Sequence, residues 1–381
     1  MRETRHNFFT RFVVAFMLVA LLVGNIPTQF ISAQAAFVTT TMTPYVLTTG
    51  SDADQNKARH YEYTSNGNSL VKFVVQESGC VSIKISTEKA GYIPIAIHKK
   101  SDASDLPTNL KAQCTEDRGN QDTILQYMKK GTYYLKFPEN TYKMDMMIYP
   151  SKSRTLKNNT FYAGYCDYNT TNTFTYKATK TGYLNFKQKP LIATSAAYKV
   201  SFYNAKGKEI MDIVCDHNTN RPIIFPVKKG QTYVMKIKTL NTDGKQYYQV
   251  RAIYTPRSKK CGTTKAKAKA IGFAKSAPGM IFAEESEKNA DWYKVTNPAT
   301  QPVLLTIFGH TYAGSLDFTV YNASGRKLGV YHLMPTTTVT LKYWLKNTNK
   351  KTTMPKGTYY VKVQKSKKET AGIYSFKFSK Q

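Results

Sequence analysis

The chain has 381 residues and carries 55 Lys and Arg against 24 Asp and Glu, which gives a formal net charge of +31 at pH 7. Its 28 tyrosines favour strands, and no segment of about a dozen residues keeps apolar side chains at helical spacing, so a mainly helical fold is excluded. The charge makes a polyanion the natural partner, although surplus lysine also serves solubility.

The first 35 residues have the layout of a secretory signal peptide. Three arginines precede an apolar run from Val13 to Gly24, and the small residues of Ala33-Gln34-Ala35 follow as a cleavage site. The run is shorter than the roughly 20 residues of a spanning helix, which weakens the alternative of an uncleaved membrane anchor. We therefore expect a secreted protein, extracellular or associated with the cell wall, without a transmembrane anchor after cleavage.

One strand pattern recurs three times in the remaining chain. It reads GTYYLKF at residues 131–137, GQTYVMKI at 230–237 and GTYYVKV at 357–363. Alternate side chains in each copy are apolar, which predicts a half-buried strand. The copies are too far apart for a solenoid repeat and have the spacing of compact domains. We therefore predict three related domains, each with its own core.

Other strands recur in a fixed order around this marker strand. The first is expected at residues 60–63, 173–176 and 291–295, the second at 80–85, 183–186 and 303–307, and the third at 200–203 and 318–321; a closing strand is expected at 146–149, 248–254 and 374–378. The predicted organisation is a signal peptide (1–35), repeat 1 (36–150), repeat 2 (151–256), a basic linker (257–275) and repeat 3 (276–381). The linker holds no acid, so we expect it to be extended by self-repulsion, with a short helix over residues 264–271 as the alternative.

Three features of the third copy resemble the bacterial pre-peptidase C-terminal (PPC) domain family. They are Asp291-Trp292-Tyr293-Lys294-Val295, the Tyr-Asn-Ala-x-Gly turn at residues 321–325, and the marker strand at 357–363 with the strand after it. The third copy matches best, and the other two are similar but divergent. The resemblance implies an all-β fold of three tandem jelly-roll-like β-sandwich domains. It also implies a place beside secreted peptidases or on cell surfaces, where some members bind carbohydrate, collagen or calcium.

Five cysteines remain after the signal peptide, and an exported chain meets oxidising conditions. Pairing within each repeat predicts the disulfides Cys80–Cys114 and Cys166–Cys215, and leaves Cys261 as the odd one. The alternative is that all five thiols stay free.

One acidic cluster stands out in the basic chain, just before the first strand of the third repeat. Glu284, Glu285, Glu287 and Asp291 could supply oxygen ligands for calcium, the single cofactor that the sequence suggests. The alternative is a solvated loop paired loosely with Lys288.

Outward tyrosines on the marker strands form a candidate ligand site. Tyr134 beside Lys136, and Tyr360 beside Lys362, could stack on a sugar and pair with an acidic substituent, although cross-strand packing explains an outward tyrosine equally well. Trp344, one of two tryptophans, is the preferred single contact residue for a glycan.

No zinc-binding His-Glu-x-x-His, no Gly-x-Ser-x-Gly elbow and no phosphate-binding glycine loop occurs, so no catalytic residue is predicted. The sequence favours a non-enzymatic surface protein that binds anionic wall polymer or glycan, without sequence-specific binding of nucleic acid. Two alternatives stay open: an accessory module of a secreted peptidase or hydrolase system, and a structural spacer.

Overall fold

The computed structural model describes residues 38–192, 197–204, 206–215, 223–312, 314–345 and 352–380. The predicted signal peptide lies outside the described residues. Within these ranges nearly all regular structure is strand; the exceptions there are the short helix α2 (Asp52–Gln55) and the 3₁₀ turn η1 (Glu116–Arg118). The all-β prediction is therefore confirmed. No helix in the described ranges is long and apolar enough to cross a membrane.

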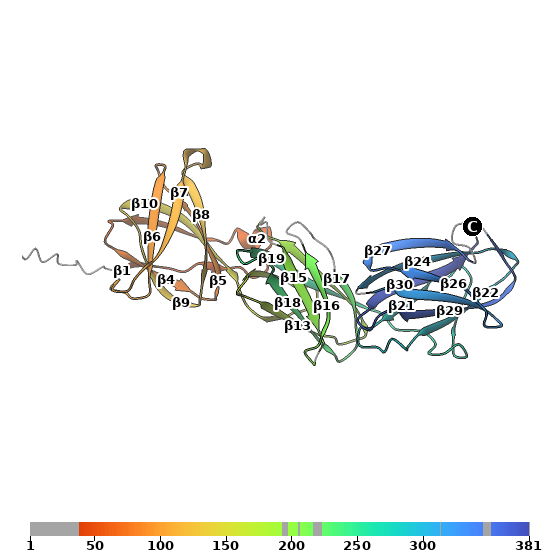
Figure 1. The fold of residues 1–381 in the computed structure, drawn as a ribbon. Helices are drawn as coiled ribbons and strands as arrows, with labels where there is room; N and C mark the ends of the chain where they lie inside the picture. The colour runs from red at the N-terminus through yellow and green to blue at the C-terminus, as the bar shows by residue number, and fades with distance from the viewer. Residues whose placement is uncertain are drawn as a thin grey trace, which may run out of the picture.

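The strands form three β-sandwiches that follow one another in a row, each built from two facing sheets around its own buried core (Figure 1). We call them sandwich 1 (β1 to β10), sandwich 2 (β11 to β19) and sandwich 3 (β20 to β30). The two sheets of sandwich 1 consist of β1 (Val38–Met42), β4 (Leu70–Val75), β9 (Gly131–Lys136), β6 (Gly91–His98) and β7 (Thr108–Cys114), and of β2 (Tyr45–Val46), β10 (Asn140–Pro150), β5 (Gly79–Ser86) and β8 (Gln121–Met128), with β3 (Arg59–Ser65) also paired to β10.

Sandwiches 2 and 3 repeat this strand order. Sandwich 2 contains β11 (Arg154–Thr155), β13 (Asn172–Lys177), β18 (Thr232–Thr239), β15 (Tyr198–Tyr203) and β16 (Glu209–Cys215), facing β12 (Phe161–Asp167), β19 (Lys245–Pro256), β14 (Gly182–Pro190) and β17 (Ile223–Val227). Sandwich 3 contains β20 (Lys269–Ile271), β22 (Asp291–Asn297), β29 (Gly357–Lys365), β25 (Leu316–Asn322) and β26 (Lys327–Leu333), facing β21 (Ala277–Ile281), β30 (Ala371–Ser379), β24 (Leu304–Tyr312) and β27 (Thr336–Trp344), with β23 (Gln301–Pro302) and β28 (Thr353–Met354) as a separate pair.

Each of the marker strands β9, β18 and β29 occupies the central position of its five-stranded sheet. A central strand must bury one face along its whole length, which explains why its alternation is the most regular signal in the sequence. Leu135, Met235 and Val361 are fully buried on these strands, as the alternation predicts.

The first strand of sandwich 1 differs from its expected place. Residues 60–63 belong to β3, which pairs with β10 in the opposite sheet, whereas β4 takes the position held by β13 and β22 in the other two sandwiches. Both segments alternate, and alternation does not say which of two sheets a strand joins.

The basic segment 257–275 is not an extended linker. β20 adds to the edge of sandwich 3 by pairing with β22, and Gly262 bridges to Trp292. Arg257 donates from Nη2 to the Tyr374 carbonyl at 2.9 Å. No helix forms over residues 264–271. Backbone pairing and bound carbonyls offset the repulsion among its cations, so this segment is part of sandwich 3.

Two smaller apolar clusters join the sandwiches. Junction 1–2 buries Leu47, Cys80, Tyr149, Ala163, Tyr165 and Tyr247. Junction 2–3 buries Met280, Phe282 and Ile373 against Tyr183 and Ile224. Sandwich 1 therefore packs through the outer side of the sheet that contains β5 and β10, and sandwiches 2 and 3 pack through the outer sides of their four-stranded sheets, together with adjoining loops.

Candidate functional site

None of the five cysteines, all of which lie in the described part of the chain, forms a disulfide, which contradicts both predicted disulfides. Cys80 and Cys114 lie on different sheets of sandwich 1, Cys80 on β5 and Cys114 on β7. Cys114 points into the core between the sheets, whereas Cys80 points away from it into junction 1–2, so the two thiols do not meet. Cys166 and Cys215 both face the core of sandwich 2 and remain thiols. Sequence spacing placed each pair in one repeat but did not show that the two members of each pair lie on different sheets.

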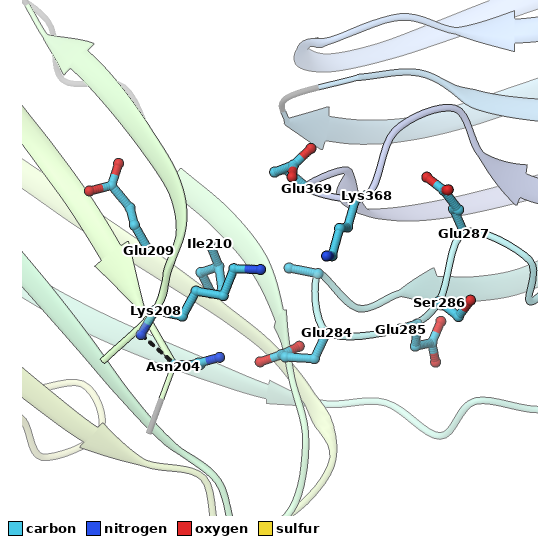
Figure 2. Close-up of a pocket in the computed structure, with 11 residues that line it drawn as sticks. Asn204, Lys208, Glu209, Ile210, Glu284, Glu285, Ser286, Glu287, Lys368 and Glu369 are labelled. Atoms are coloured by element: carbon cyan, nitrogen blue, oxygen red, sulfur yellow. Dashed lines mark hydrogen bonds between the residues drawn. The ribbon is translucent and has the colours of Figure 1, made fainter. Parts of the chain in front are cut away.

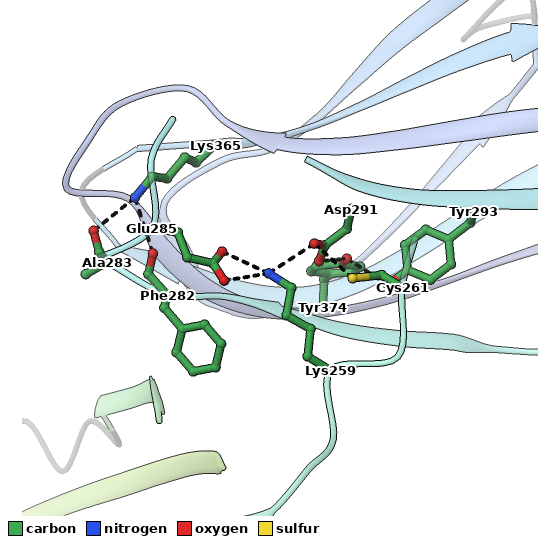
Figure 3. A network of polar contacts seen from close by, with 9 residues as sticks. All are labelled: Lys259, Cys261, Phe282, Ala283, Glu285, Asp291, Tyr293, Lys365 and Tyr374. Carbon is green, nitrogen blue, oxygen red and sulfur yellow. Dashed lines mark hydrogen bonds and ion pairs between the residues drawn. The ribbon is translucent and has the colours of Figure 1, made fainter. Parts of the chain in front are cut away.

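The four acidic residues proposed for calcium do not come together as one metal site. Asp291 is only 2% exposed because it lies in phase with the buried Tyr293 on β22. Lys259, from the basic segment, binds Asp291 Oδ1 at 3.0 Å and Glu285 Oε1 at 2.7 Å with its Nζ (Figure 3). An ammonium therefore occupies the place proposed for the metal ion, and no group of three or more His, Cys, Asp or Glu in the described ranges could hold one.

Three donors surround the carboxylate of Asp291. Besides Lys259, the Tyr374 hydroxyl donates to Oδ2 at 2.7 Å and the Cys261 thiol donates to Oδ1 at 3.2 Å (Figure 3). Burial alone would lower the pKa of Lys259, but the two carboxylates outweigh it and raise that pKa. The network is a structural contact, one ammonium shared by two carboxylates, that fastens the basic segment to sandwich 3.

Glu284 and Glu287 face a polar crevice between sandwiches 2 and 3 (Figure 2). The crevice has a volume of about 480 Å³ and is lined from one side by Asn204, Lys208, Glu209 and Ile210, and from the other by Ala283 to Glu287, Lys368 and Glu369. Desolvation raises the pKa of Glu284. Lysines alternate with the acids here, so the crevice does not present a single sign of charge.

The predicted tyrosine–lysine pair of sandwich 3 lies on the outer face of its five-stranded sheet. Tyr360 and Lys362 are half-buried on β29, directly opposite Lys294 and Trp292 of β22. Across the strand on the other side lies Tyr321 of β25, whose ring stacks on Trp292 with 5.7 Å between centroids. The arrangement brings two stacked aromatic rings and two lysines onto one exposed surface.

A third lysine reaches this surface from the basic segment. Lys265 Nζ lies 4.8 Å from the centroid of the Tyr360 ring and donates to the Ala323 carbonyl at 3.3 Å. It therefore links the Tyr-Asn-Ala-x-Gly turn to the marker strand. We call Trp292, Lys294, Tyr321, Tyr360, Lys362 and Lys265 the sandwich 3 face.

The corresponding surfaces of the other sandwiches are poorer in aromatic residues. In sandwich 2, Val234 replaces the outward tyrosine, and Lys236 Nζ lies 4.5 Å from the centroid of Tyr203. In sandwich 1, Tyr134 lies between Lys72 and His98, and Lys136 lies opposite Leu70 and Ala96. No tryptophan stands on either surface.

Trp344 is not part of the sandwich 3 face. It ends β27, opposite Leu304, and β27 is at the edge of the other sheet of sandwich 3. Trp292 and Tyr321 were not among the predicted site residues, because they are far apart in the chain and meet only across β29. The local signal for the outward tryptophan was its position one residue before Tyr293. Tyr293 and Val295 face the core on β22, so Trp292 faces outward.

Comparison with known proteins gives no family. No protein-family model and no curated protein matches the chain. Similar solved structures include tripeptidyl peptidase 2 (10% identity over 85% of this chain and 34% of that one, TM-score 0.23), the CBM22 tandem domain of a Paenibacillus barcinonensis protein (6%, 58% and 87%, 0.18) and an archaeal-virus turret protein with a triple jelly-roll fold (7%, 91% and 97%, 0.22). The chain spans about a third of the peptidase. At these TM-scores the likenesses carry no argument about function.

Proposed function

We propose that this chain is a secreted, non-catalytic binding protein that associates with an anionic wall polymer or an acidic glycan through the sandwich 3 face. The observation that carries the proposal is the stacked pair Trp292–Tyr321 with Lys362 and Lys294 beside it on an exposed sheet.

The chemistry of this surface suits a charged sugar polymer. Half-exposed aromatic rings offer flat apolar area to a pyranose ring, while the neighbouring ammonium groups attract carboxylate or phosphate substituents. Trp292 pairs with Lys362, and Tyr360 pairs with Lys294 and Tyr321, so no acidic residue is directly opposite either ring on a neighbouring strand. Attraction to the rest of this strongly basic chain would add a long-range, salt-dependent contribution.

Binding of the intact three-sandwich chain to purified Gram-positive wall tests the proposal. The wall is used before and after removal of its teichoic acid, across a series of salt concentrations. We expect binding that weakens steeply with salt and with removal of the polymer. Binding that survives both treatments would point to neutral glycan, and no binding at all would favour a peptidase accessory or a spacer.

Substitutions locate the surface. Trp292→Ala should weaken binding about tenfold or more, since truncation of a dominant aromatic contact residue typically costs about 2 kcal/mol or more. Lys362→Gln should weaken it less and reduce the salt dependence. Lys377→Gln is the matched control, because Lys377 is exposed on β30 in the opposite sheet and carries the same charge. If Trp344→Ala abolishes binding while Trp292→Ala does not, the site lies at β27 instead.

A further inference from the structure

A second cationic surface lies on sandwich 2, on the outer side of its smaller sheet. Cross-strand pairing sets Phe161, Arg251 and Lys187 side by side on β12, β19 and β14, and places Lys189 opposite Gln249 in the next outward row. These residues, with Gln188, line a pocket of about 240 Å³. We call it the Arg251 pocket.

The pocket lies between the two junctions. Along β19, Tyr247 of junction 1–2 lies on one side of Gln249 and Arg251, and Thr255, opposite Tyr183 of junction 2–3, lies on the other. The neighbouring sandwiches therefore stand at both ends of this face and leave its middle open as a recess.

The charge of the pocket is one-sided. Its lining includes three cations and no acid, and none of the ion pairs among the described residues involves Lys187, Lys189 or Arg251. Lys187 and Arg251 are direct cross-strand neighbours, an arrangement of like charges that destabilises a sheet. A bound anion would remove that repulsion.

The guanidinium of Arg251 is held in place before any ligand arrives. Its Cζ lies 4.3 Å from the centroid of the Phe161 ring, and its Nε is buried with no hydrogen-bond partner in the described part of the chain. Gln249, beside it, is fixed by a 2.7 Å hydrogen bond from Nε2 to the Thr49 carbonyl of sandwich 1. Stacking fixes the guanidinium plane, so less conformational entropy is lost when the donors bind an oxyanion.

We propose that Arg251, Lys187 and Lys189 bind a phosphate-type oxyanion. A planar guanidinium binds two oxygens of such a group at once, and two ammonium groups supply further donors and charge. The pocket is smaller than the usual range for sites that enclose a drug-sized molecule, so it accepts one anionic group, free or carried on a larger ligand. The inference deepens the proposed function, because a phosphodiester wall polymer is one source of that group, but binding of a small anion does not depend on it.

Calorimetric titration of the intact three-sandwich chain with inorganic phosphate, against chloride at equal ionic strength, tests the site directly. We expect saturable binding of phosphate beyond the chloride baseline. Arg251→Lys, which keeps the charge but loses the planar fork, should weaken it about tenfold. Lys187→Gln with Lys189→Gln should weaken it at least as much, and this variant keeps the Arg251–Phe161 contact in case the arginine substitution disturbs folding.

The matched control is Lys177→Gln with Lys180→Gln, which removes the same charge from exposed positions of the same sandwich. Equal loss in the control and pocket variants, or no phosphate signal beyond chloride, overturns the site. Poly(glycerol phosphate) and phosphatidylglycerol vesicles, titrated into the same variants, then identify the source of the group. Phosphate binding without wall binding would remove the proposed function and keep this site, and Trp292→Ala should leave phosphate binding unchanged.

Discussion

Junctions 1–2 and 2–3 connect sandwiches of the same strand order, yet they are made of different kinds of side chain. Junction 1–2 is a cluster of tyrosines, in which Tyr247 packs at 5.0 Å from Tyr149 and 5.2 Å from Tyr165 between ring centroids. Junction 2–3 has a smaller apolar cluster and is bordered by ionisable groups, among them Arg257 and Lys259.

The two junctions differ because they enclose different polar groups. In junction 1–2 backbone groups form hydrogen bonds across the boundary; the Ala163 amide, for example, donates to the Thr48 carbonyl at 2.9 Å. The other contacts there are mainly between aromatic rings. In junction 2–3 the basic segment crosses the boundary, so its half-buried cations Arg257 and Lys259 bind carbonyls and carboxylates. We therefore expect junction 1–2 to depend on packing and junction 2–3 on charge and pH.

Tyr247→Ala should have the largest effect. Removing a fully buried aromatic side chain costs about 3–5 kcal/mol, and Tyr247 also contacts the Cys80 sulfur at 3.3 Å. The measurement is the urea concentration at which Cys80 reacts with a thiol reagent. Tyr247→Phe is the control and should cost less than about 1.5 kcal/mol, because only the hydroxyl contact is lost. Equal effects of the two changes would mean that packing does not hold the junction.

Lys259→Met should destabilise sandwich 3 by about 2–4 kcal/mol, because Asp291 and Glu285 would lose their shared counter-ion. Adding Asp291→Asn and Glu285→Gln to the same chain should recover part of the loss, since no uncompensated charge then remains. Denaturant unfolding followed by tryptophan fluorescence measures both, as both tryptophans belong to sandwich 3. If the triple variant is the less stable of the two, the network is not held by charge.

His310 predicts acid sensitivity near junction 2–3. Its ring is 2% exposed beside Tyr312, neither nitrogen has a hydrogen-bond partner among the described residues, and burial lowers its pKa to about 4. The unfolded state, with a pKa near 6.5, binds the proton more readily. Stability is therefore complete above pH 6.5 and falls as the pH drops toward 4, by about 1–3 kcal/mol.

His310→Phe should remove that pH dependence, because phenylalanine stays neutral and still packs on Tyr312. Melting temperatures between pH 7 and pH 4 measure it. If the melting temperature of His310→Phe still falls between pH 7 and pH 4 as in the unsubstituted chain, His310 is not the source of the acid sensitivity.

Asp54 of sandwich 1 titrates at lower pH. Burial raises its pKa, but hydrogen bonds from Tyr45 and the amides of residues 48–50 outweigh this and lower the pKa to about 2. The stability that Asp54 contributes is therefore lost only as the pH falls from about 4 toward 2.

The thiols give the smallest effect, one of rate and not of stability. Cys261 near junction 2–3 is half-buried, whereas Cys80, Cys114, Cys166 and Cys215 are buried. We expect Cys261 to react first in the native protein, slowly at neutral pH because burial raises its pKa to about 12. All five thiols should react in denaturant without reductant. A smaller number would show that a disulfide is present after all.

Local patterns in the sequence determined the all-β class and the inward face of each marker strand. Leu135 and Val361 had to be buried and Tyr360 and Lys362 had to face outward, because successive residues of a strand point to opposite sides.

Only the tertiary structure decided which strands became neighbours. Trp292 meets Tyr321 across β29, Arg251 stands between Phe161 and Lys187, and Lys259 occupies the place proposed for calcium. Each of these contacts joins residues far apart in the chain, and alternation specifies the side of a strand without naming its partner. Cys80 and Cys114 do not pair for the same reason: the sequence places them in one repeat, but they lie on different sheets, with Cys114 facing the core and Cys80 facing junction 1–2.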